Sequence, residues 1–250
     1  MANPTLDTLL NHRSIRRFTA EKLTAAEVTT LVDAAQHAPT STFSQQYSII
    51  SITDPQQLAT LGDITGHHWL EKAGHFFLFL ADQYRNAQLA PKTSTTTANL
   101  HSTDKLLAGI FDASIAAEAM VVAGESLGLG STIMGSILND ADQVISLCQL
   151  PPLTFPVFGL AMGHPAEQPE QKPRLPQSLM HFTNHYQPLA STADLASYDQ
   201  TIADYYQSRG THQRAETFSH HIAAELSRDP QQRAKLAQVL QAQGFLNSLP

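Results

Sequence analysis

The sequence is poor in cysteine and contains no long apolar run. Cys148 is the single cysteine among 250 residues, which excludes an internal disulfide framework and a metal site built from cysteine alone. No apolar run approaches the ~20 residues that cross a bilayer, and the first residues lack the charged and apolar regions of a secretory signal. We therefore expect a cytoplasmic protein without a membrane partner.

Basic residues are also scarce. The chain has 15 Lys and Arg against 22 Asp and Glu, a formal net charge of -7. With no basic stripe along the chain, this balance argues against a nucleic-acid partner. Charged residues make up 15% and hydrophobic residues 42%, which is typical of a globular chain with a sizeable core rather than a disordered one.

Several catalytic signatures are missing. There is no G-x-S-x-G elbow, and the glycines of residues 128–135 match neither the dinucleotide fingerprint nor the P-loop. His181 and His185 have the spacing of a metal pair, but no glutamate lies between them. Asp112 and Glu118 are six residues apart, so they do not share a helical face. The sequence thus predicts no nucleophile, no carboxylate acid/base pair and no metal site.

Two short basic clusters stand out on this acidic chain. Residues 12–18 read His-Arg-Ser-Ile-Arg-Arg-Phe, and residues 172–176 read Lys-Pro-Arg-Leu-Pro. The arginine fork matches phosphate oxygens, and lysine adds a point charge. The clusters are either one local anion site or two solvated basic turns, and by themselves they leave both interpretations open.

Residues 39–45 form a second polar segment. They read Pro-Thr-Ser-Thr-Phe-Ser-Gln between a predicted helix and a predicted strand. The segment is either an ordinary polar loop or a row of hydroxyl and amide groups that bind the edge of a polar heterocycle. Taken alone, it does not decide between them.

Hydrophobic patterning predicts an α+β fold. The expected helices are 24–38 with a capping box, a short helix that begins at Pro55 after an Asp54 cap, and 104–127; the expected strands are 47–53, 76–81, 131–134 and 155–163. Helix 104–127 is apolar almost all round, which places it in a core or an interface. Residues 92–103 are expected to form a mobile loop. Because composition shifts after Pro165, we predict a core of 1–165 and an extension of 166–250 within one domain.

Together these segments resemble the FMN-dependent nitroreductase family, in its NADPH-preferring, oxygen-insensitive nitroreductase and flavin reductase branch. The resemblance covers nearly the whole chain in order. It is carried by residues 12–18, 41–45, 125–130, 133–136, 158–160, 172–176 and 205–210. It implies a mostly antiparallel sheet flanked by helices, a homodimer formed through helix 104–127, and a C-terminal extension that wraps the partner.

The resemblance also implies FMN as cofactor and NADPH as co-substrate. The residues similar to those that hold the FMN phosphate and ribityl chain are His12, Arg13, Ser14, Arg16, Lys172 and Arg174. Those similar to residues at the isoalloxazine are Ser41, Phe43 and Gln45 from the partner subunit, His68 over the ring, and Ile133, Met134, Gly135 and Ser136 near N5. Arg209 and Arg214 resemble the segment that binds the 2′-phosphate of NADPH; the alternative is two exposed helix-end arginines.

The chain departs from the branch pattern in several places, and Met134 and Ser136 are also looser matches. His68 stands where the branch typically has glutamine, and Leu138 replaces a common arginine. The C-terminal arginine of the acceptor pocket has no clean counterpart, although Arg228 is a nearby candidate. These departures bear on acceptor preference more than on flavin binding.

The implied function is a ping-pong redox cycle. Hydride moves from NADPH to FMN and then to a nitroaromatic, quinone or free flavin acceptor, with no side chain as nucleophile. Two alternatives stay open: an enzyme whose main role is flavin or quinone reduction, and a flavin-binding redox sensor without useful turnover.

Overall fold

The computed structural model describes residues 3–210, 213–229 and 231–247. They form two compact units. The first consists of residues 3–169 and 231–247, and the second of residues 170–210 and 213–229. The expected division into a core of 1–165 and an extension of 166–250 stays a prediction. The structure adds that the C-terminal segment from residue 231 packs with the first unit, which carries the sheet.

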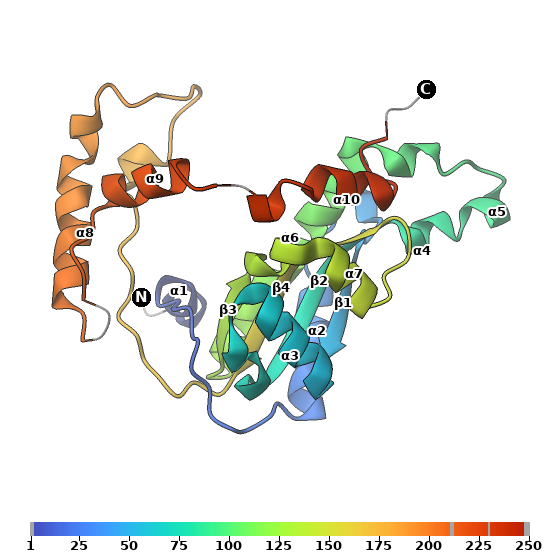
Figure 1. Ribbon diagram of the computed structural model, residues 1–250, viewed down its shortest axis with the longest axis horizontal. Helices are drawn as coiled ribbons and strands as arrows, with labels where there is room; N and C mark the ends of the chain where they lie inside the picture. Colours follow the sequence, from blue (N-terminus) through green and yellow to red (C-terminus); the bar gives the residue numbers. More distant parts are fainter. Residues whose placement is uncertain (1–2, 211–212, 230, 248–250) are drawn as a thin grey trace. The chain divides into compact units, whose positions relative to one another are not determined.

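The first unit is built on a four-stranded antiparallel sheet (Figure 1). Its strands are β1 (Tyr47–Ile52), β2 (His75–Asp82), β3 (Gly130–Met134) and β4 (Thr154–Gly163), in the order β1-β2-β4-β3. Pairs such as Phe77 with Leu160 set the central register, and one irregularity lies between Phe79 and Leu80. The predicted α+β fold, with an antiparallel sheet flanked by helices, is confirmed.

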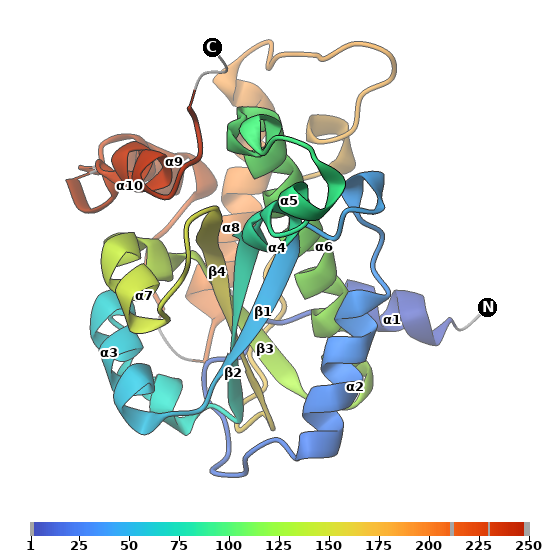
Figure 2. The same ribbon diagram turned by 90° about the vertical axis from the view of Figure 1, so that its right-hand side faces the viewer.

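Helices cover both faces of this sheet. The helices of the first unit are α1 (Pro4–Leu10), α2 (Ala25–Gln36), α3 (Pro55–Thr65), α4 (Tyr84–Ala87), α5 (Ala90–Thr93), α6 (Thr103–Ser126), α7 (Ala141–Leu147) and α10 (Leu236–Ala242). The 3₁₀ turns are η1 (Ser41–Phe43), η2 (His68–Lys72), η3 (Ala98–His101), η4 (Gly135–Asp140) and η7 (Gln231–Arg233). Figure 2 shows α2 and α3 on opposite sides of the sheet.

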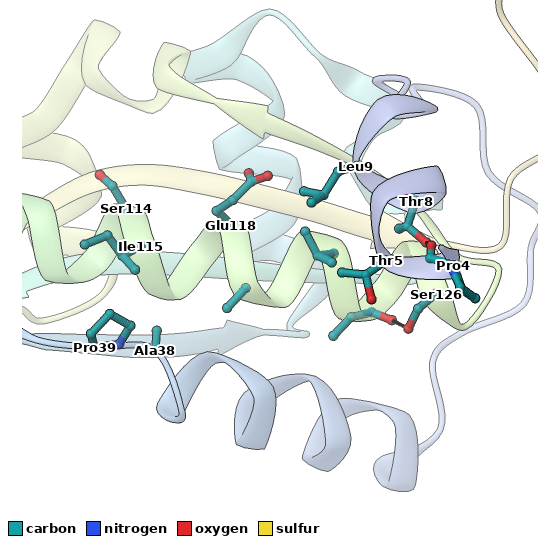
Figure 3. A pocket seen from close by; sticks show the side chains of 13 residues that line it. Pro4, Thr5, Thr8, Leu9, Ala38, Pro39, Ser114, Ile115, Glu118 and Ser126 are labelled. Carbon is teal, nitrogen blue, oxygen red and sulfur yellow. Dashed lines mark hydrogen bonds between the residues drawn. The ribbon is translucent and has the colours of Figure 1, made fainter. Parts of the chain in front are cut away.

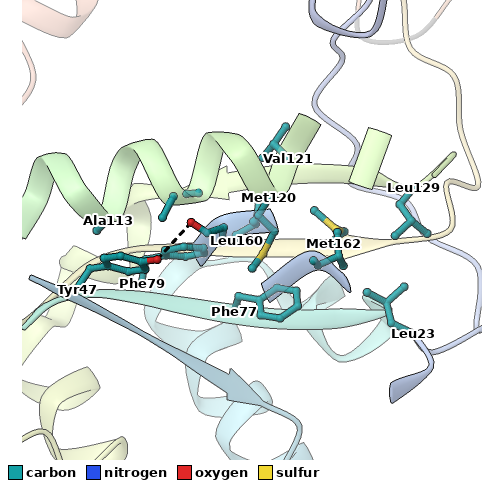
Figure 4. Close-up of a cluster of buried hydrophobic side chains, with 14 residues drawn as sticks. Leu23, Tyr47, Phe77, Phe79, Ala113, Met120, Val121, Leu129, Leu160 and Met162 are labelled. Carbon is teal, nitrogen blue, oxygen red and sulfur yellow. Dashed lines mark hydrogen bonds between the residues drawn. The ribbon is translucent and has the colours of Figure 1, made fainter. Parts of the chain in front are cut away.

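Strand β2 contributes side chains to two hydrophobic cores. Phe77 and Phe79 pack with α2 and α6 on one face (Figure 4), whereas Phe76, Leu78 and Leu80 pack with α3 and α7 on the other. Successive side chains of a strand point to opposite faces. The continuous apolar run in the sequence therefore reflects burial on both faces, as predicted.

Local capping signals set the helix starts that the sequence predicts. Thr24 and Glu27 form a reciprocal capping box at α2. Asp54 accepts the N–H groups of Gln56 and Gln57 before α3, and Gly66 ends that helix at φ 71°. The two predicted helix starts are confirmed, and the end of α3 at Gly66 is an addition from the structure.

Helix α6 is partly buried and partly exposed. Ala113, Ala116 and Met120 are fully buried against the sheet, while Leu107, Phe111 and Ile115 are exposed by 43%, 55% and 43%. By length and composition alone α6 could cross a membrane, yet half of its most apolar window is buried inside the protein. Its packing is that of a core helix with one uncovered apolar stripe.

The predicted loop of residues 92–103 is correct only in part, because α5 ends at Thr93 and η3 occupies Ala98–His101. The cause is tertiary packing with the C-terminal segment: Leu100 packs in the core around Phe245, and the ring Nδ1 of His101 lies 2.6 Å from the Gly244 carbonyl oxygen. A local sequence pattern does not contain these contacts. The mobility of the loop stays a prediction.

The second unit has a small core of its own. It contains α8 (Ala196–Ser208), α9 (Phe218–Leu226) and the turns η5 (Gln177–Leu179) and η6 (Thr192–Leu195). Tyr198, Ile202 and Tyr206 of α8 are buried, with Leu175 and Phe218 packed against them. The aromatic rings of α8 thereby anchor the segment that carries the second basic cluster.

Candidate active site

The first basic cluster is attached to β3. Ser14 forms a parallel bridge with Ser131, and the Ile15 N–H donates to the Ser131 carbonyl at 2.8 Å. Ile15 is buried over Gly130, where a Cβ would lie 2.5 Å from Ile15 Cγ1. Glycine at 130 thus allows the cluster to lie directly on the strand.

This close approach gives a first prediction. Gly130→Ala should force Ile15 away from β3, lowering the free energy of unfolding by about 1–3 kcal/mol and weakening FMN binding along with it. Thermal denaturation of the apoprotein and a flavin titration measure both effects. Gly135→Ala is the control for stability, because a Cβ there meets nothing within 4 Å. Equal melting temperatures for the two variants would contradict the prediction.

The residues of the first basic cluster differ in their hydrogen-bond partners. His12 Nδ1 lies 2.6 Å from Glu125 Oε1, and the backbone N–H groups of Arg16 and Arg17 donate to Glu167 Oε1 at 2.8 and 3.0 Å. Arg13 Nε is buried with no hydrogen-bond partner among the described residues. A buried donor left unpaired is unfavourable unless something absent from the protein chain accepts it.

The Ser41 to Gln45 segment has a strained backbone and exposed side chains. Thr42, Phe43 and Gln45 all have positive φ, at 51°, 57° and 48°. Ser41, Phe43 and Gln45 are exposed, Phe43 by 83%. Strain of this kind in non-glycine residues collects at functional sites. The predicted loop therefore presents its side chains outward from a fixed backbone.

The strip from Ile133 to Ser136 joins the end of β3 to η4. Ile133 is 49% exposed, Met134 is buried, and Gly135 is exposed with open space around it. Arg233 Nη2 donates to the Gly135 carbonyl at 2.9 Å and to Asn139 Oδ1 at 3.2 Å. The sequence interpretation missed Arg233, and only the return of the chain to the first unit brings it to this strip.

The two adjacent histidines behave differently. The side chain of His68 is 73% exposed, with Nδ1 3.6 Å from Asp63 Oδ1. His67 is half-buried beside Trp69, at a ring separation of 5.6 Å. Burial, and secondly the charge of Arg16, lower the pKa of His67. The neighbour of the first basic cluster is therefore His67, whereas the flavin-facing role of His68 stays a prediction.

The second basic cluster lies in the second unit. Lys172 and Arg174 are exposed. Between them the Pro173 carbonyl accepts a hydrogen bond from the Tyr198 hydroxyl at 3.2 Å, which fixes the segment against α8. A site shared by the two basic clusters stays a prediction.

The two arginines predicted to bind NADPH share one aromatic ring. The guanidinium carbons of Arg209 and Arg214 lie 5.6 and 4.0 Å from the centre of the Tyr206 ring. Glu170 approaches Arg209 Nε at 3.7 Å, yet that nitrogen is buried without a hydrogen bond in the described part of the chain. The structure thus brings these arginines together beyond the end of α8, which a separation of five residues outside a helix does not predict.

The remaining candidates for chemistry lie apart from these clusters. Cys148 is half-buried and forms the C-cap of α7. Burial raises the pKa of its thiol, which disfavours the reactive thiolate. Within residues 3–210, 213–229 and 231–247, no group of three His, Cys, Asp or Glu could hold a metal ion.

Comparison with known proteins gives a consistent result. Residues 9–164 match the nitroreductase family, and residues 172–248 match the nitroreductase family C-terminal domain. The chain is 41% identical over 249 residues to the FMN reductase (NADPH) of Bacillus subtilis, covering 97% of this chain and 98% of that protein. It is 38% identical to the oxygen-insensitive NADPH nitroreductase of Salmonella typhimurium, with coverages of 97% and 98%.

Solved structures agree. The NfrA1 nitroreductase from B. subtilis superimposes with a TM-score of 0.90 at 41% identity, covering 96% of this chain and 98% of that one. The NADPH:FMN oxidoreductase from Vibrio harveyi, complexed with NAD+, gives 0.88 at 34% identity, with coverages of 98% and 100%. Together with the antiparallel fold and the basic cluster on β3, these matches show that the chain belongs to the nitroreductase family.

Proposed function

We propose that this chain is an FMN-dependent oxidoreductase that uses NADPH to reduce nitroaromatic, quinone or flavin acceptors. The observation that carries the proposal is similarity along 97% of the chain to an FMN reductase (NADPH) and an NADPH nitroreductase, at 41% and 38% identity. A cytoplasmic location, expected from the sequence, stays a prediction.

The residues on β3 fit an anionic, flat cofactor. The buried, unpaired N–H of Arg13 is a ready donor for a phosphate oxygen. Just past the far end of β3, a Cβ at Gly135 would meet nothing within 4 Å, so a flat group could approach the backbone there. We expect Arg13, with His12, Ser14 and Arg16, to hold the phosphate and ribityl chain of FMN, and Lys172 and Arg174 to add charge there.

Bound FMN supplies two-electron hydride exchange, so the chain needs no nucleophile of its own. The role of the protein is to bind and orient the donor and the acceptor. We expect both to use one open face in turn, which is a ping-pong order. Arg209 and Arg214 would bind the 2′-phosphate of NADPH and so select it over NADH.

Arg233 is the better candidate for an acceptor-pocket arginine than Arg228. It places a guanidinium on the Gly135 carbonyl, in the turn where Leu138 replaces a common arginine, whereas the Arg228 guanidinium pairs with Glu225 at 3.6 Å. We expect Arg233→Ala to raise the KM for an anionic nitroaromatic acceptor about tenfold, because a cation beside the open face is lost.

Steady-state kinetics at saturating NADPH measure this effect. Lys235→Ala is the matched control, since it removes another exposed cation of the same segment. Acceptor KM values within twofold of one another for the two variants would remove Arg233 from the acceptor pocket.

The exposed stripe of α6 supports a homodimer. It borders an apolar groove of about 810 Å³ (Figure 3). The groove is lined by Pro4, Thr5, Thr8, Leu9, Ala38, Pro39, Ser114, Ile115, Glu118, Ala119, Val122, Ala123 and Ser126. An apolar surface of this kind is typical of an interface, and a second copy would cover it. Sedimentation equilibrium should give the mass of a dimer, and a monomer at micromolar concentration would contradict this assembly.

The activity itself is tested by steady-state oxidation of NADPH. We expect turnover that requires FMN and an added acceptor, and parallel double-reciprocal lines when NADPH and a nitroaromatic are varied together. Intersecting lines would contradict the ping-pong order. Absence of turnover with every acceptor, in protein that retains FMN, would favour the redox sensor.

The main acceptor is a separate question. A specificity constant for free flavin or quinone far above that for nitroaromatics would make flavin or quinone reduction the principal role, with nitro groups incidental.

A further inference from the structure

The backbone of residues 41–46 is held in a conformation that its sequence disfavours. Thr42, Phe43 and Gln45 lie in the left-handed region, which side chains with a Cβ rarely adopt and which is least suited to a β-branched residue such as Thr42. No glycine relieves the turn. Contacts from outside the loop must therefore maintain it.

The principal contact is a buried carboxylate on α6. Asp112 is 1% exposed. Its Oδ1 accepts the Ser41 N–H at 2.7 Å, and its Oδ2 accepts the Gln46 N–H at 2.9 Å. One carboxylate thus joins both ends of the loop, through charge-assisted hydrogen bonds, which are the strong ones.

Further side chains hold the same loop from its inner side. Gln46 is buried and donates to the Ser41 carbonyl at 3.3 Å, and its own amide oxygen accepts from Gln83 at 2.8 Å. Arg85 donates to the Gln45 carbonyl, and Asn86 donates to the Ser44 carbonyl at 3.2 Å. The backbone is thereby fixed while the side chains that face outward stay available for binding.

We propose that Asp112 is a positioning residue for flavin binding, acting through the loop that presents Ser41, Phe43 and Gln45. This inference rests on the proposed function, because those side chains are the ones expected at the isoalloxazine edge. Both Asp112 oxygens are occupied by backbone donors, so the residue is not an acid or a base in the reaction. The buried carboxylate instead holds a strained loop in place.

The test is Asp112→Asn, with Asp104→Asn as the matched control on the same helix. Asparagine keeps the shape of aspartate but turns an NH₂ group toward one backbone N–H. In the apoprotein, hydrogen exchange at the Ser41 and Gln46 amides should accelerate at least about tenfold, while β2 amides stay unchanged. FMN and riboflavin should both bind about 10- to 100-fold more weakly, by the same factor, because the loop contacts the ring rather than the phosphate.

A second variant addresses the loop without touching the core. Thr42→Pro fixes φ near -65° at an exposed position, which excludes the left-handed conformation. It should weaken both flavins equally, as Asp112→Asn does, so the inference stays testable if the Asp112 variant does not fold.

Flavin affinities within twofold of wild type in either folded variant would overturn the inference, as would acceleration of exchange throughout the protein rather than in the loop. Different results would refute the proposed function and the role of Asp112. A wild-type protein that binds neither FMN nor riboflavin would refute the proposed function. Normal wild-type binding with no loss in the variants would refute only the role of Asp112.

Discussion

Arg13→Ala is expected to weaken FMN binding about 100-fold while leaving riboflavin binding within threefold of wild type. The reason is the buried Nε of Arg13, which has no partner in the described part of the chain. That donor is already desolvated, so a phosphate oxygen gains a charge-assisted hydrogen bond without a further desolvation cost, and each such bond contributes about 1.5–3 kcal/mol. Riboflavin lacks the phosphate, so its affinity should not depend on Arg13.

We also expect the apoprotein to lose no stability. Removing the buried, unpartnered Nε relieves an unfavourable group, and the hydrogen bond lost, from Arg13 Nη1 to the Asn11 carbonyl at 3.2 Å, is exposed, so Arg13→Ala apoprotein should melt no lower than wild type. Arg17→Ala is the matched control, because its guanidinium is exposed and lies 4.0 Å from Glu167. Fluorescence titration of the apoproteins gives the affinities. Equal losses in the two variants, or an equal loss of riboflavin, would exclude Arg13 from the phosphate site.

Arg209→Ala is expected to raise the apparent KM for NADPH about 10- to 100-fold and that for NADH less than threefold. Arg209 is held between Tyr205 and Tyr206, with ring distances of 5.4 and 5.6 Å, and its Nε is buried without a hydrogen bond among the described residues. A guanidinium fixed in this way is preorganised for a phosphate, and only NADPH carries the 2′-phosphate.

A second variant of Arg209 separates its charge from its planar shape, and a neighbouring residue provides the control. Arg209→Lys keeps the charge but loses the planar fork, so its KM for NADPH should fall between wild type and Arg209→Ala. Gln207→Ala, an exposed neighbour on α8, should change neither constant. The measurement is the ratio of kcat/KM for NADPH to that for NADH. An unchanged ratio in Arg209→Ala would show that Arg209 is an ordinary helix-end arginine and does not bind the 2′-phosphate of NADPH.

Much of the fold follows from local signals. The Thr24–Glu27 capping box, the Asp54 cap and the β2 run each depend on a few adjacent residues, and the structure contains all of them. The same holds for α6, whose lack of a polar face predicted a core or interface helix. The structure of residues 92–103 was harder to predict, because it depends on packing against Phe245 and Gly244, which are distant in the sequence.

The site is less accessible to sequence interpretation, because its decisive contacts join distant positions. Asp112 meets Ser41 across 71 residues, and Arg233 meets Gly135 across 98. One signal was present for Asp112: a carboxylate on the apolar side of a helix must find donors if it is buried. For Arg233, only the folded chain identifies the residue.

An anaerobic titration of the gently purified protein with NADPH, followed by its visible spectrum, tests the proposed activity. We expect a bound yellow flavin that bleaches at about one NADPH per FMN and regains its colour when a nitroaromatic or quinone is added. A bound flavin that NADPH does not bleach would contradict the proposed activity. A colourless protein that also rejects added FMN would contradict the assignment of the basic cluster on β3 to a flavin phosphate.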